Sequence, residues 1–205
     1  MRPVSGRLDR LRLALHPLAS PPGGPGWNIG GFDDLVDADA LMPAAVLVGL
    51  VPRGDGVGVL LTRRIDALRH HGGQVSFPGG RIDPNDRDAV DAALRETEEE
   101  VGIPRALVEP WGYLDPLATI TGFRVMPVVA AIDPSYVAVP DPREVAEAFE
   151  VDLDYLLAAE NRTVRRLDHA GRAREVWEYR YEPQRIWGAT AAMLVNLADR
   201  LERSA

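Results

Sequence analysis

Four glutamates crowd the end of one predicted helix, in the segment LRETEEEVGI. They are Glu96, Glu98, Glu99 and Glu100, and Gly102 follows them as a natural helix stop. The C-terminal end of a helix carries partial negative charge and favours cations. At about 100° per residue, Glu96, Glu99 and Glu100 share one face, whereas Glu98 points elsewhere. Like charges four residues apart cost about 0.2–0.5 kcal/mol, so this arrangement needs a counter-cation.

A hard divalent cation suits these carboxylates. Arg95 can pair with Glu99 at i,i+4, but one arginine cannot neutralise three carboxylates. Clustered carboxylate oxygens are typical ligands of Mg²⁺ or Mn²⁺. Gly80 lies a short loop before the helix, and glycine lets main chain approach closely, so its carbonyl could join the same ion. A solvated acidic helix face is the simpler interpretation of such a run, and the flanking sequence favours the metal site.

The apolar pattern predicts the elements that must position these side chains. Residues 87–101 form a helix with Asp83 or Asp86 as its N-cap. Residues 44–51 and 57–62 are continuous apolar runs that predict two buried strands in a hairpin. The remaining predicted elements are strands near 107–114 and 124–132, a short helix at 152–157 after a loop carrying Glu144 and Glu147, a hairpin of 162–169 and 174–181, and a closing helix at 186–201. Mixed strands with helices before, between and after them predict an α/β sandwich.

Composition restricts the classes of function. The 205 residues fit one ordinary domain with terminal extensions. The chain has no cysteine, which excludes disulfides and thiolate sites and fits a reducing, cytoplasmic location. It also has no lysine, so neither a Schiff-base nor a P-loop lysine is available. The net charge of −8 argues against nucleic-acid or membrane binding, and no apolar run is long enough to span a membrane.

The segment from Gly80 to Ile103 resembles the Nudix hydrolase pattern, in which a Gly, a loop and a helix precede REUxEExGU, where U is aliphatic. Here Thr97 stands at an aliphatic position, and the spacing from Gly80 to Arg95 is one residue longer than the common pattern. The usual early Glu is absent, and Asp86 is nearest to its place. The resemblance implies an α/β/α sandwich with a mixed β-sheet. It places a hydrolase domain at 44–205, with an N-terminal helix and a Pro/Gly-rich extension at 1–43 packed on it.

The longer spacing is similar to that of one subgroup, the Nudix coenzyme A pyrophosphatases. Their second signature is LLTxR, Ser or Ala, x₃, R, x₃, G, x₃, FPGG. Residues 60–80, LLTRRIDALRHHGGQVSFPGG, match every fixed position except Ile65. The resemblance implies metal-dependent hydrolysis of the pyrophosphate bond of coenzyme A or its thioesters. The products would be adenosine 3′,5′-bisphosphate and 4′-phosphopantetheine, or its acylated form.

The resemblance also implies roles for individual residues. Glu99, Glu100 and the Gly80 carbonyl would hold the metal ion. Glu96 would be a further ligand or the general base, and Arg95 would orient it by a charge-assisted hydrogen bond.

Outside this helix, three positions have expected roles. Arg64 and Arg69 match the two signature arginines and suit bidentate phosphate contact, although one of them could make a structural ion pair instead. Nudix enzymes often add a carboxylate from a downstream loop. Glu144 and Glu147 are the candidates, and we favour Glu144.

Two other functions stay open at this point. One is a Nudix hydrolase of another nucleoside diphosphate derivative, such as ADP-ribose, NADH or a dinucleoside polyphosphate, and Ile65 is the main reason to keep it. The other is a nucleotide-sensing module without catalysis, which the intact Glu96, Glu99 and Glu100 disfavour. In every case the expected partner is a small molecule, with no nucleic acid and no membrane. The sequence leaves the oligomeric state open.

Overall fold

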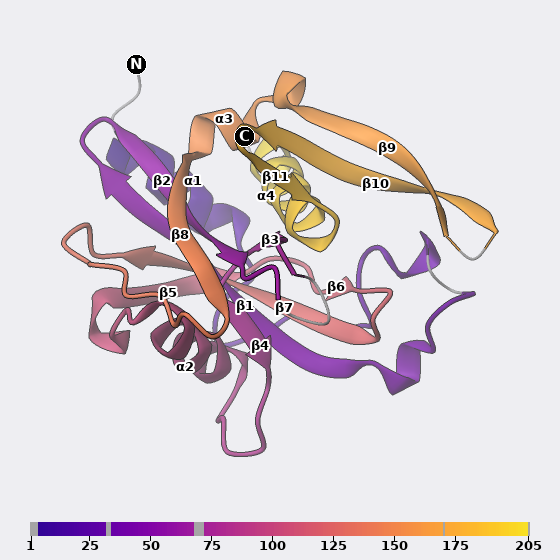
Figure 1. Ribbon diagram of the computed structural model, residues 1–205. Helices are drawn as coiled ribbons and strands as arrows, with labels where there is room; N and C mark the ends of the chain where they lie inside the picture. The colour runs from indigo at the N-terminus through magenta and orange to yellow at the C-terminus, as the bar shows by residue number, and fades with distance from the viewer. Residues whose placement is uncertain (1–3, 32–33, 68–71, 170, 205) are drawn as a thin grey trace.

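The computed structural model describes residues 4–31, 34–67, 72–169 and 171–204 (Figure 1). Its helices are α1 (Val4–Ala14), α2 (Ala89–Val101), α3 (Leu153–Leu157) and α4 (Ala189–Arg203), with short 3-10 helices at Ile29–Gly31, Ala38–Ala40, Arg105–Leu107 and Ala159–Asn161. Its strands are β1 (Met42–Arg53), β2 (Gly56–Arg64), β3 (Val75–Ser76), β4 (Gly79–Arg81), β5 (Val108–Tyr113), β6 (Leu117–Ala118), β7 (Phe123–Ile132), β8 (Val145–Asp152), β9 (Arg162–His169), β10 (Arg172–Tyr181) and β11 (Gln184–Trp187).

The large sheet is mixed and is centred on β1. β1 runs parallel to β7 on one side. On its other side it pairs antiparallel with β4 through its first half and with β2 through its second half. β3 and β8 add to β2, and β5 and β6 add to β7, all antiparallel. The predicted β1–β2 hairpin and the predicted strands at β5 and β7 are confirmed.

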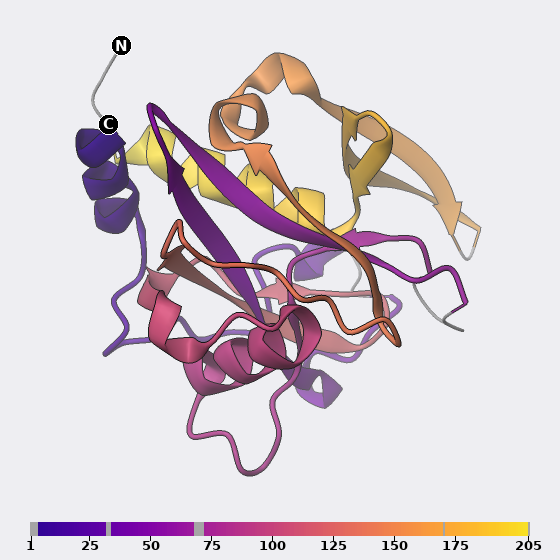
Figure 2. The same cartoon turned by 60° about the vertical axis from the view of Figure 1, so that its left-hand side comes forward.

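Helices cover both faces of this sheet. One face packs on α2 through a core that includes Leu47, Leu60 and Val101, all fully buried. The other face packs on α1 and α4 through a second core that includes Leu11 and Leu197. Figures 1 and 2 show α2 on one side of the sheet and α4 on the other. The predicted α/β/α sandwich with a mixed sheet is therefore confirmed.

A second, three-stranded sheet covers α4 on its outer side. β10 pairs antiparallel with β9 and with β11, which confirms the predicted hairpin of 162–169 and 174–181. Tyr179 and Ile186 point from this sheet into the α4 core and are fully buried. α4 therefore lies between two sheets.

Two predicted helix boundaries were wrong. α2 starts at Ala89, and its N-cap is Asp88, which accepts a hydrogen bond from Asp91 N at 2.8 Å. Asp86 does not cap the helix, because its carboxylate bonds Arg95 instead. The final helix starts at Ala189, because residues 184–187 pair with β10 as β11. Gly188, at φ +64°, forms the turn between β11 and the helix.

The N-terminal segment packs against the rest of the fold. Leu11 of α1 is fully buried in the core it shares with α4. After α1, His16 Nε2 lies 2.7 Å from Asp115 Oδ1, and Arg200 of α4 donates to the same oxygen at 2.9 Å. The division at 43/44 between an extension and a hydrolase domain stays a prediction. None of the described helices is long and apolar enough to cross a membrane.

Candidate active site

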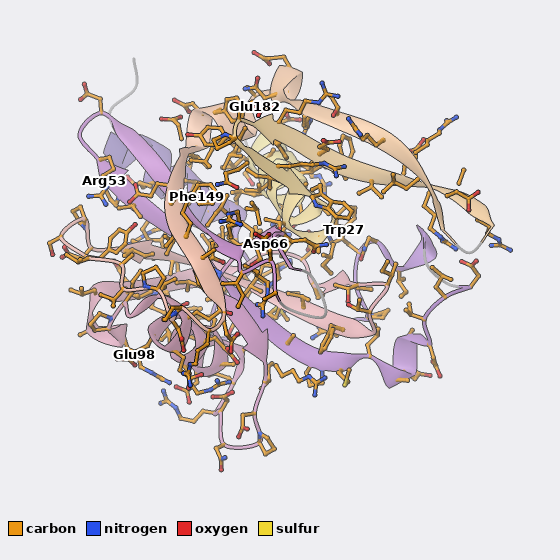
Figure 3. The ribbon with its side chains drawn as sticks, in the orientation of Figure 1. Trp27, Arg53, Asp66, Glu98, Phe149 and Glu182 are labelled. Carbon is orange, nitrogen blue, oxygen red and sulfur yellow. The ribbon has the colours of Figure 1, made fainter. Side chains whose placement is uncertain are left out.

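Every carboxylate at the end of α2 has a cationic or N–H partner. Arg95 Nη1 donates to Glu96 at 3.0 Å and to Glu99 at 3.1 Å, so the predicted contacts of Arg95 are present. Glu98 lies 3.6 Å from Arg105 Nε, on the outer edge of α2 and away from the end of β2 (Figure 3). The negative charge of these glutamates is therefore compensated by several arginines, whereas the sequence had indicated Arg95 alone.

The main chain at this helix end is capped by a loop. Gly102, at φ +68°, donates its N–H to Glu98 O at 3.0 Å. Val139 N donates to Val101 O at 2.8 Å, and Asp141 N donates to Glu100 O at 2.9 Å. These bonds satisfy carbonyls that a helix end otherwise leaves open. They also fix the loop that leads to Glu144, whose N–H donates to Asp141 O at 3.0 Å.

Glu100 is the most deeply buried of these carboxylates, at 5% exposure. It accepts a hydrogen bond from Gly79 N at 3.2 Å, and Arg64 Nη1 lies 3.5 Å away. Burial raises the pKa of Glu100 to about 7, despite the opposing effects of Arg64 and the Gly79 N–H. Glu100 is therefore a buried carboxylate whose charge is incompletely compensated.

Glu96 packs directly on the main chain of Gly80. A Cβ atom at position 80 would lie 2.4 Å from Glu96 Oε1, so no other residue fits there without displacing the carboxylate. Burial raises the pKa of Glu96, and the hydrogen bond from Arg95 acts against this effect. Gly80 and Glu96 are thus brought together, as the proposed metal site requires.

Arg95 links α2 to the segment before it. Its Nε and Nη2 atoms each donate to Asp86 at 2.9 Å, and Nη2 also donates to Arg81 O at 3.1 Å. These hydrogen bonds from Arg95 lower the pKa of Asp86. Asp86, which is nearest to the place of the missing early Glu, therefore holds Arg95, and Arg95 in turn holds Glu96.

Consecutive arginines at the end of β2 point to opposite faces of the sheet, because side chains alternate along a strand. Arg64 points to the α2 face, where its guanidinium lies 3.5 Å from Glu100 and 3.4 Å from Glu144. Arg63 points to the other face and lies 3.9 Å from Glu147. The structure thus places Arg64 between two carboxylates.

The same alternation separates the two downstream candidates. Glu147 is on β8, not in a loop as predicted; it pairs in register with Arg63 and accepts a hydrogen bond from Gln184 at 2.8 Å. Glu144 lies just before β8, and its charge raises the pKa values of Glu96 and Glu100. Glu144 therefore belongs with the α2 carboxylates, whereas Glu147 faces the opposite side.

Two signature positions remain. Ile65 contributes its main chain, since its N–H donates to Glu144 O at 3.0 Å, a bond that does not depend on its side chain. Arg69 lies outside the described residues.

The donor chemistry of this site fits a hard divalent cation. Glu96, Glu99, Glu100 and Glu144 supply carboxylate oxygens only, which are ligands that Mg²⁺ and Mn²⁺ prefer. In the described part of the chain, no three acidic or histidine side chains stand close enough together to chelate one ion. Glu99 is turned to Arg95, and Glu100 to Gly79 N and Arg64.

Sequence reasoning missed the loop at 139–141 and the contact of Arg64 with carboxylates. A signal for the second was available, because LLTRR is a strand pattern in which two adjacent arginines must face opposite ways. No signal in the sequence marked Val139 or Asp141, since both act through their backbone N–H groups.

Comparison with known proteins gives a consistent result. The family model described as NUDIX domain matches residues 41–169. A protein from Yersinia enterocolitica, named uncharacterized Nudix hydrolase NudL, is 41% identical over 158 residues, which cover 77% of this chain and 80% of that protein. A protein of the same name from Photorhabdus laumondii is 39% identical over 159 residues, covering 78% of this chain and 84% of its own length.

Among solved structures, a MutT/nudix family protein from Enterococcus faecalis matches with a TM-score of 0.50 and 16% identity. The match covers 80% of this chain and 62% of that one. At this identity it supports the fold and nothing finer.

Proposed function

The chain belongs to the Nudix family and is a hydrolase of nucleoside diphosphate derivatives, and we propose that its substrate is coenzyme A or one of its thioesters. The observation that carries this proposal is the place of the coenzyme A signature. Its first arginine, Arg64, lies 3.5 Å from Glu100 and 3.4 Å from Glu144. Its last residue, Gly80, contacts Glu96. The signature therefore borders the α2 carboxylates from both ends.

In the proposed site, Glu96, Glu99, Glu100 and the Gly80 carbonyl hold Mg²⁺ or Mn²⁺. A bound divalent ion would neutralise phosphate charge and lower the pKa of a bound water. Arg95 fixes the orientation of Glu96 through its hydrogen bond at 3.0 Å. A covalent route through Cys or Lys is excluded, because the sequence contains neither residue.

We assign proton removal from the attacking water to Glu96 or Glu144. The water oxygen bonds to phosphorus, the bridging P–O bond breaks, and the leaving phosphate oxygen takes the electron pair. For coenzyme A the products are adenosine 3′,5′-bisphosphate and 4′-phosphopantetheine. Arg64, freed from the carboxylates, would bind a substrate phosphate in a bidentate manner.

A Mg²⁺-dependent hydrolysis panel tests this function. Coenzyme A, acetyl-CoA, ADP-ribose, NADH and a dinucleoside polyphosphate are compared, with products identified by mass and Glu100→Gln as the blank. Adenosine 3′,5′-bisphosphate from coenzyme A as the dominant product supports the proposal. Preferred cleavage of ADP-ribose or NADH would contradict the substrate assignment and leave the metal site standing.

A further inference from the structure

Arg81 directly follows Gly80 on β4, at the edge of the large sheet. Among the described strands only β1 pairs with β4, so the other edge of β4 is open. Side chains of α2 contact the main chain of β4. Gly79 N donates to Glu100 at 3.2 Å, and Arg81 O accepts from Arg95 at 3.1 Å. The α2 carboxylates therefore stand beside the short strand that carries Arg81.

The side chain of Arg81 points to the face of the sheet opposite α2. A Cβ atom at Gly80 would point at Glu96, and successive side chains of a strand point to opposite faces. Arg81 pairs in register with Ala44, which belongs to the core on the α4 side. Its guanidinium lies over the ring of Phe123, 5.3 Å from the centroid, and this ring packs against the same core. Arg81 and the carboxylates thus lie on the two sides of β4.

The charge of Arg81 has no anionic partner among the described residues. Arg81 is exposed, and its side chain forms no hydrogen bond or ion pair with any of them. Its contact with Phe123 leaves the guanidinium N–H groups free, because the edges of a stacked guanidinium still point outward. In contrast, Arg64 lies near Glu100 and Glu144. In a chain with 31 acidic and 23 basic residues, an arginine without a carboxylate beside the active site is available to an anionic ligand.

A substrate bound at the α2 carboxylates lies within reach of Arg81. The Cα atoms of Gly80 and Arg81 are about 3.8 Å apart, and an extended arginine side chain reaches about 7 Å from its Cα. In coenzyme A, the ribose joins the 3′-phosphate to the pyrophosphate through a few bonds, which span about 7 Å at most. Since no ion pair with a described residue holds Arg81, its guanidinium can turn from Phe123 toward the open edge of β4. The pyrophosphate and the 3′-phosphate can thus meet the two sides of this edge at once.

We propose that Arg81 binds the 3′-phosphate of coenzyme A and thereby selects this substrate. The inference rests on the proposed function and adds to it the residue that recognises the phosphomonoester. In the proposed site the metal ion and Arg64 bind the pyrophosphate, so the charge of Arg81 is left for a further anionic group. ADP-ribose and NADH lack this phosphate, so Arg81 would add affinity for coenzyme A and none of this kind for them.

The kinetic test compares coenzyme A with dephospho-coenzyme A, which lacks only this phosphate. Wild type should have the higher kcat/KM for coenzyme A. Arg81→Gln should lower the ratio of the two kcat/KM values roughly tenfold, the factor for a hydrogen bond between charged groups at an exposed site, and the change should lie in KM. Arg81→Lys keeps the charge and should recover part of the ratio.

Arg12→Gln is the matched control. The guanidinium of Arg12 also lies over an aromatic ring, that of Trp111, 4.2 Å from its centroid. Trp111 is on β5, which β1 and β7 separate from β4. The ratio in Arg12→Gln should stay within about twofold of wild type. A wild-type ratio near one, or a loss in Arg81→Gln that is equal for both substrates, overturns the inference.

Direct binding separates this inference from the proposed function. Adenosine 3′,5′-bisphosphate and AMP are titrated calorimetrically, with Mg²⁺ present, into wild type, Arg81→Gln and Arg12→Gln. Wild type and Arg12→Gln should bind the bisphosphate roughly tenfold more tightly than AMP, and Arg81→Gln should bind both alike. This result supports the inference even if the hydrolysis panel selects another substrate.

Two outcomes of the titration overturn the inference even if coenzyme A is hydrolysed. One is equal binding of the two nucleotides by wild type. The other is a preference for the bisphosphate that persists in Arg81→Gln, because another residue then binds the phosphate. Arg81 has no ion pair with a described residue to lose, so Arg81→Gln should fold as wild type does, with circular dichroism as the check.

Discussion

Two glutamates are buried to nearly the same degree and differ in what surrounds them. Glu100 is 5% exposed and Glu178 is 2% exposed. Glu178 is bonded by Arg185 and paired with Arg165, and although burial raises its pKa, these arginines more than offset the effect and lower it. Glu100 has a guanidinium at 3.5 Å and one backbone N–H at 3.2 Å, and its pKa rises to about 7.

The difference teaches how to distinguish a structural carboxylate from a functional one. Burial is common to both residues and carries no information about role. Incomplete compensation does, because a folded chain tolerates a buried charge of this kind where a ligand supplies the missing partner. The charge of Glu178 is compensated by the arginines that contact it, whereas the charge of Glu100 is compensated only in part and is available to a ligand.

The largest expected effect is the loss of activity on removing the charge of Glu100. We expect Glu100→Gln to lower kcat/KM about 10³-fold or more, since the proposed metal site loses a ligand while the side chain keeps its shape. The rate of hydrolysis of the preferred substrate measures this, with circular dichroism as the check on folding. Glu98→Gln is the matched control on the same helix turn, because Glu98 points outward to Arg105. Equal losses in the two variants would contradict the assignment.

The second prediction concerns stability against pH without metal. The pKa of Glu100 rises from 4.5 to about 7 on folding, so the folded state binds this proton more tightly than the unfolded state. The contribution of Glu100 to stability should therefore be fully present below about pH 4.5 and be lost as the pH rises through about 7. At about 1.4 kcal/mol per pH unit, the full difference is about 3 kcal/mol.

Urea unfolding in a chelator at pH 5 and pH 8 measures this fall. Glu100→Gln should remove the part of this fall that Glu100 causes, so the variant should be more stable than wild type at pH 8. A variant less stable than wild type at pH 8 would show that the charge of Glu100 stabilises the metal-free fold.

The third prediction concerns the satisfied glutamate. Glu178→Gln removes the carboxylate shared by Arg165 and Arg185, whose side chains are about half exposed. Water then solvates part of their charge, so we expect a loss of about 2 kcal/mol, below the usual cost of breaking a fully buried pair. Thermal unfolding at pH 8 measures it. If Glu100→Gln stabilises the protein and Glu178→Gln destabilises it, the two glutamates differ as described. If both changes in stability have the same sign, they do not.

The sequence predicted the helices and strands correctly where the pattern of apolar residues matched a single type of secondary structure. The apolar runs of β1 and β2 and the stop at Gly102 each had a local cause, and the structure has them. β8 was missed as a strand, because its polar residues Glu147 and Glu150 are three positions apart and the segment lacks the alternation of a half-buried strand. That error left Glu144 and Glu147 unresolved.

Other features depended on contacts between distant segments. Asp83, Asp86 and Asp88 are all good caps by type, and the cap fell to Asp88 while Asp86 bonded Arg95 nine residues away. Ile186 and Trp187 fit the apolar pattern of the last helix, and pairing with β10 made them a strand. At these positions, contacts with segments distant in the sequence determined the local structure, and local propensity did not.

The smallest expected effect belongs to Arg64, the cation that stands beside Glu100. Its guanidinium lies 3.5 Å from Glu100 and 3.4 Å from Glu144, so Arg64→Gln should cost about 1 kcal/mol or less of stability when measured in a chelator. A divalent ion bound to the same carboxylates would be repelled by this guanidinium, so the variant should bind Mn²⁺ about three- to tenfold more tightly. Calorimetric titration with Mn²⁺ measures this affinity.

Arg63→Gln is the control for Arg64→Gln, because it removes the same charge one residue earlier on the opposite face of the sheet. It should leave the affinity for Mn²⁺ unchanged. If both variants bind the ion equally well, long-range charge decides metal affinity and the position of Arg64 does not. If Arg64→Gln binds Mn²⁺ more weakly, Arg64 supports the metal site and does not compete with it. Tighter binding by Arg64→Gln and not by Arg63→Gln would mean that Glu100 is partnered by Arg64 until metal binds.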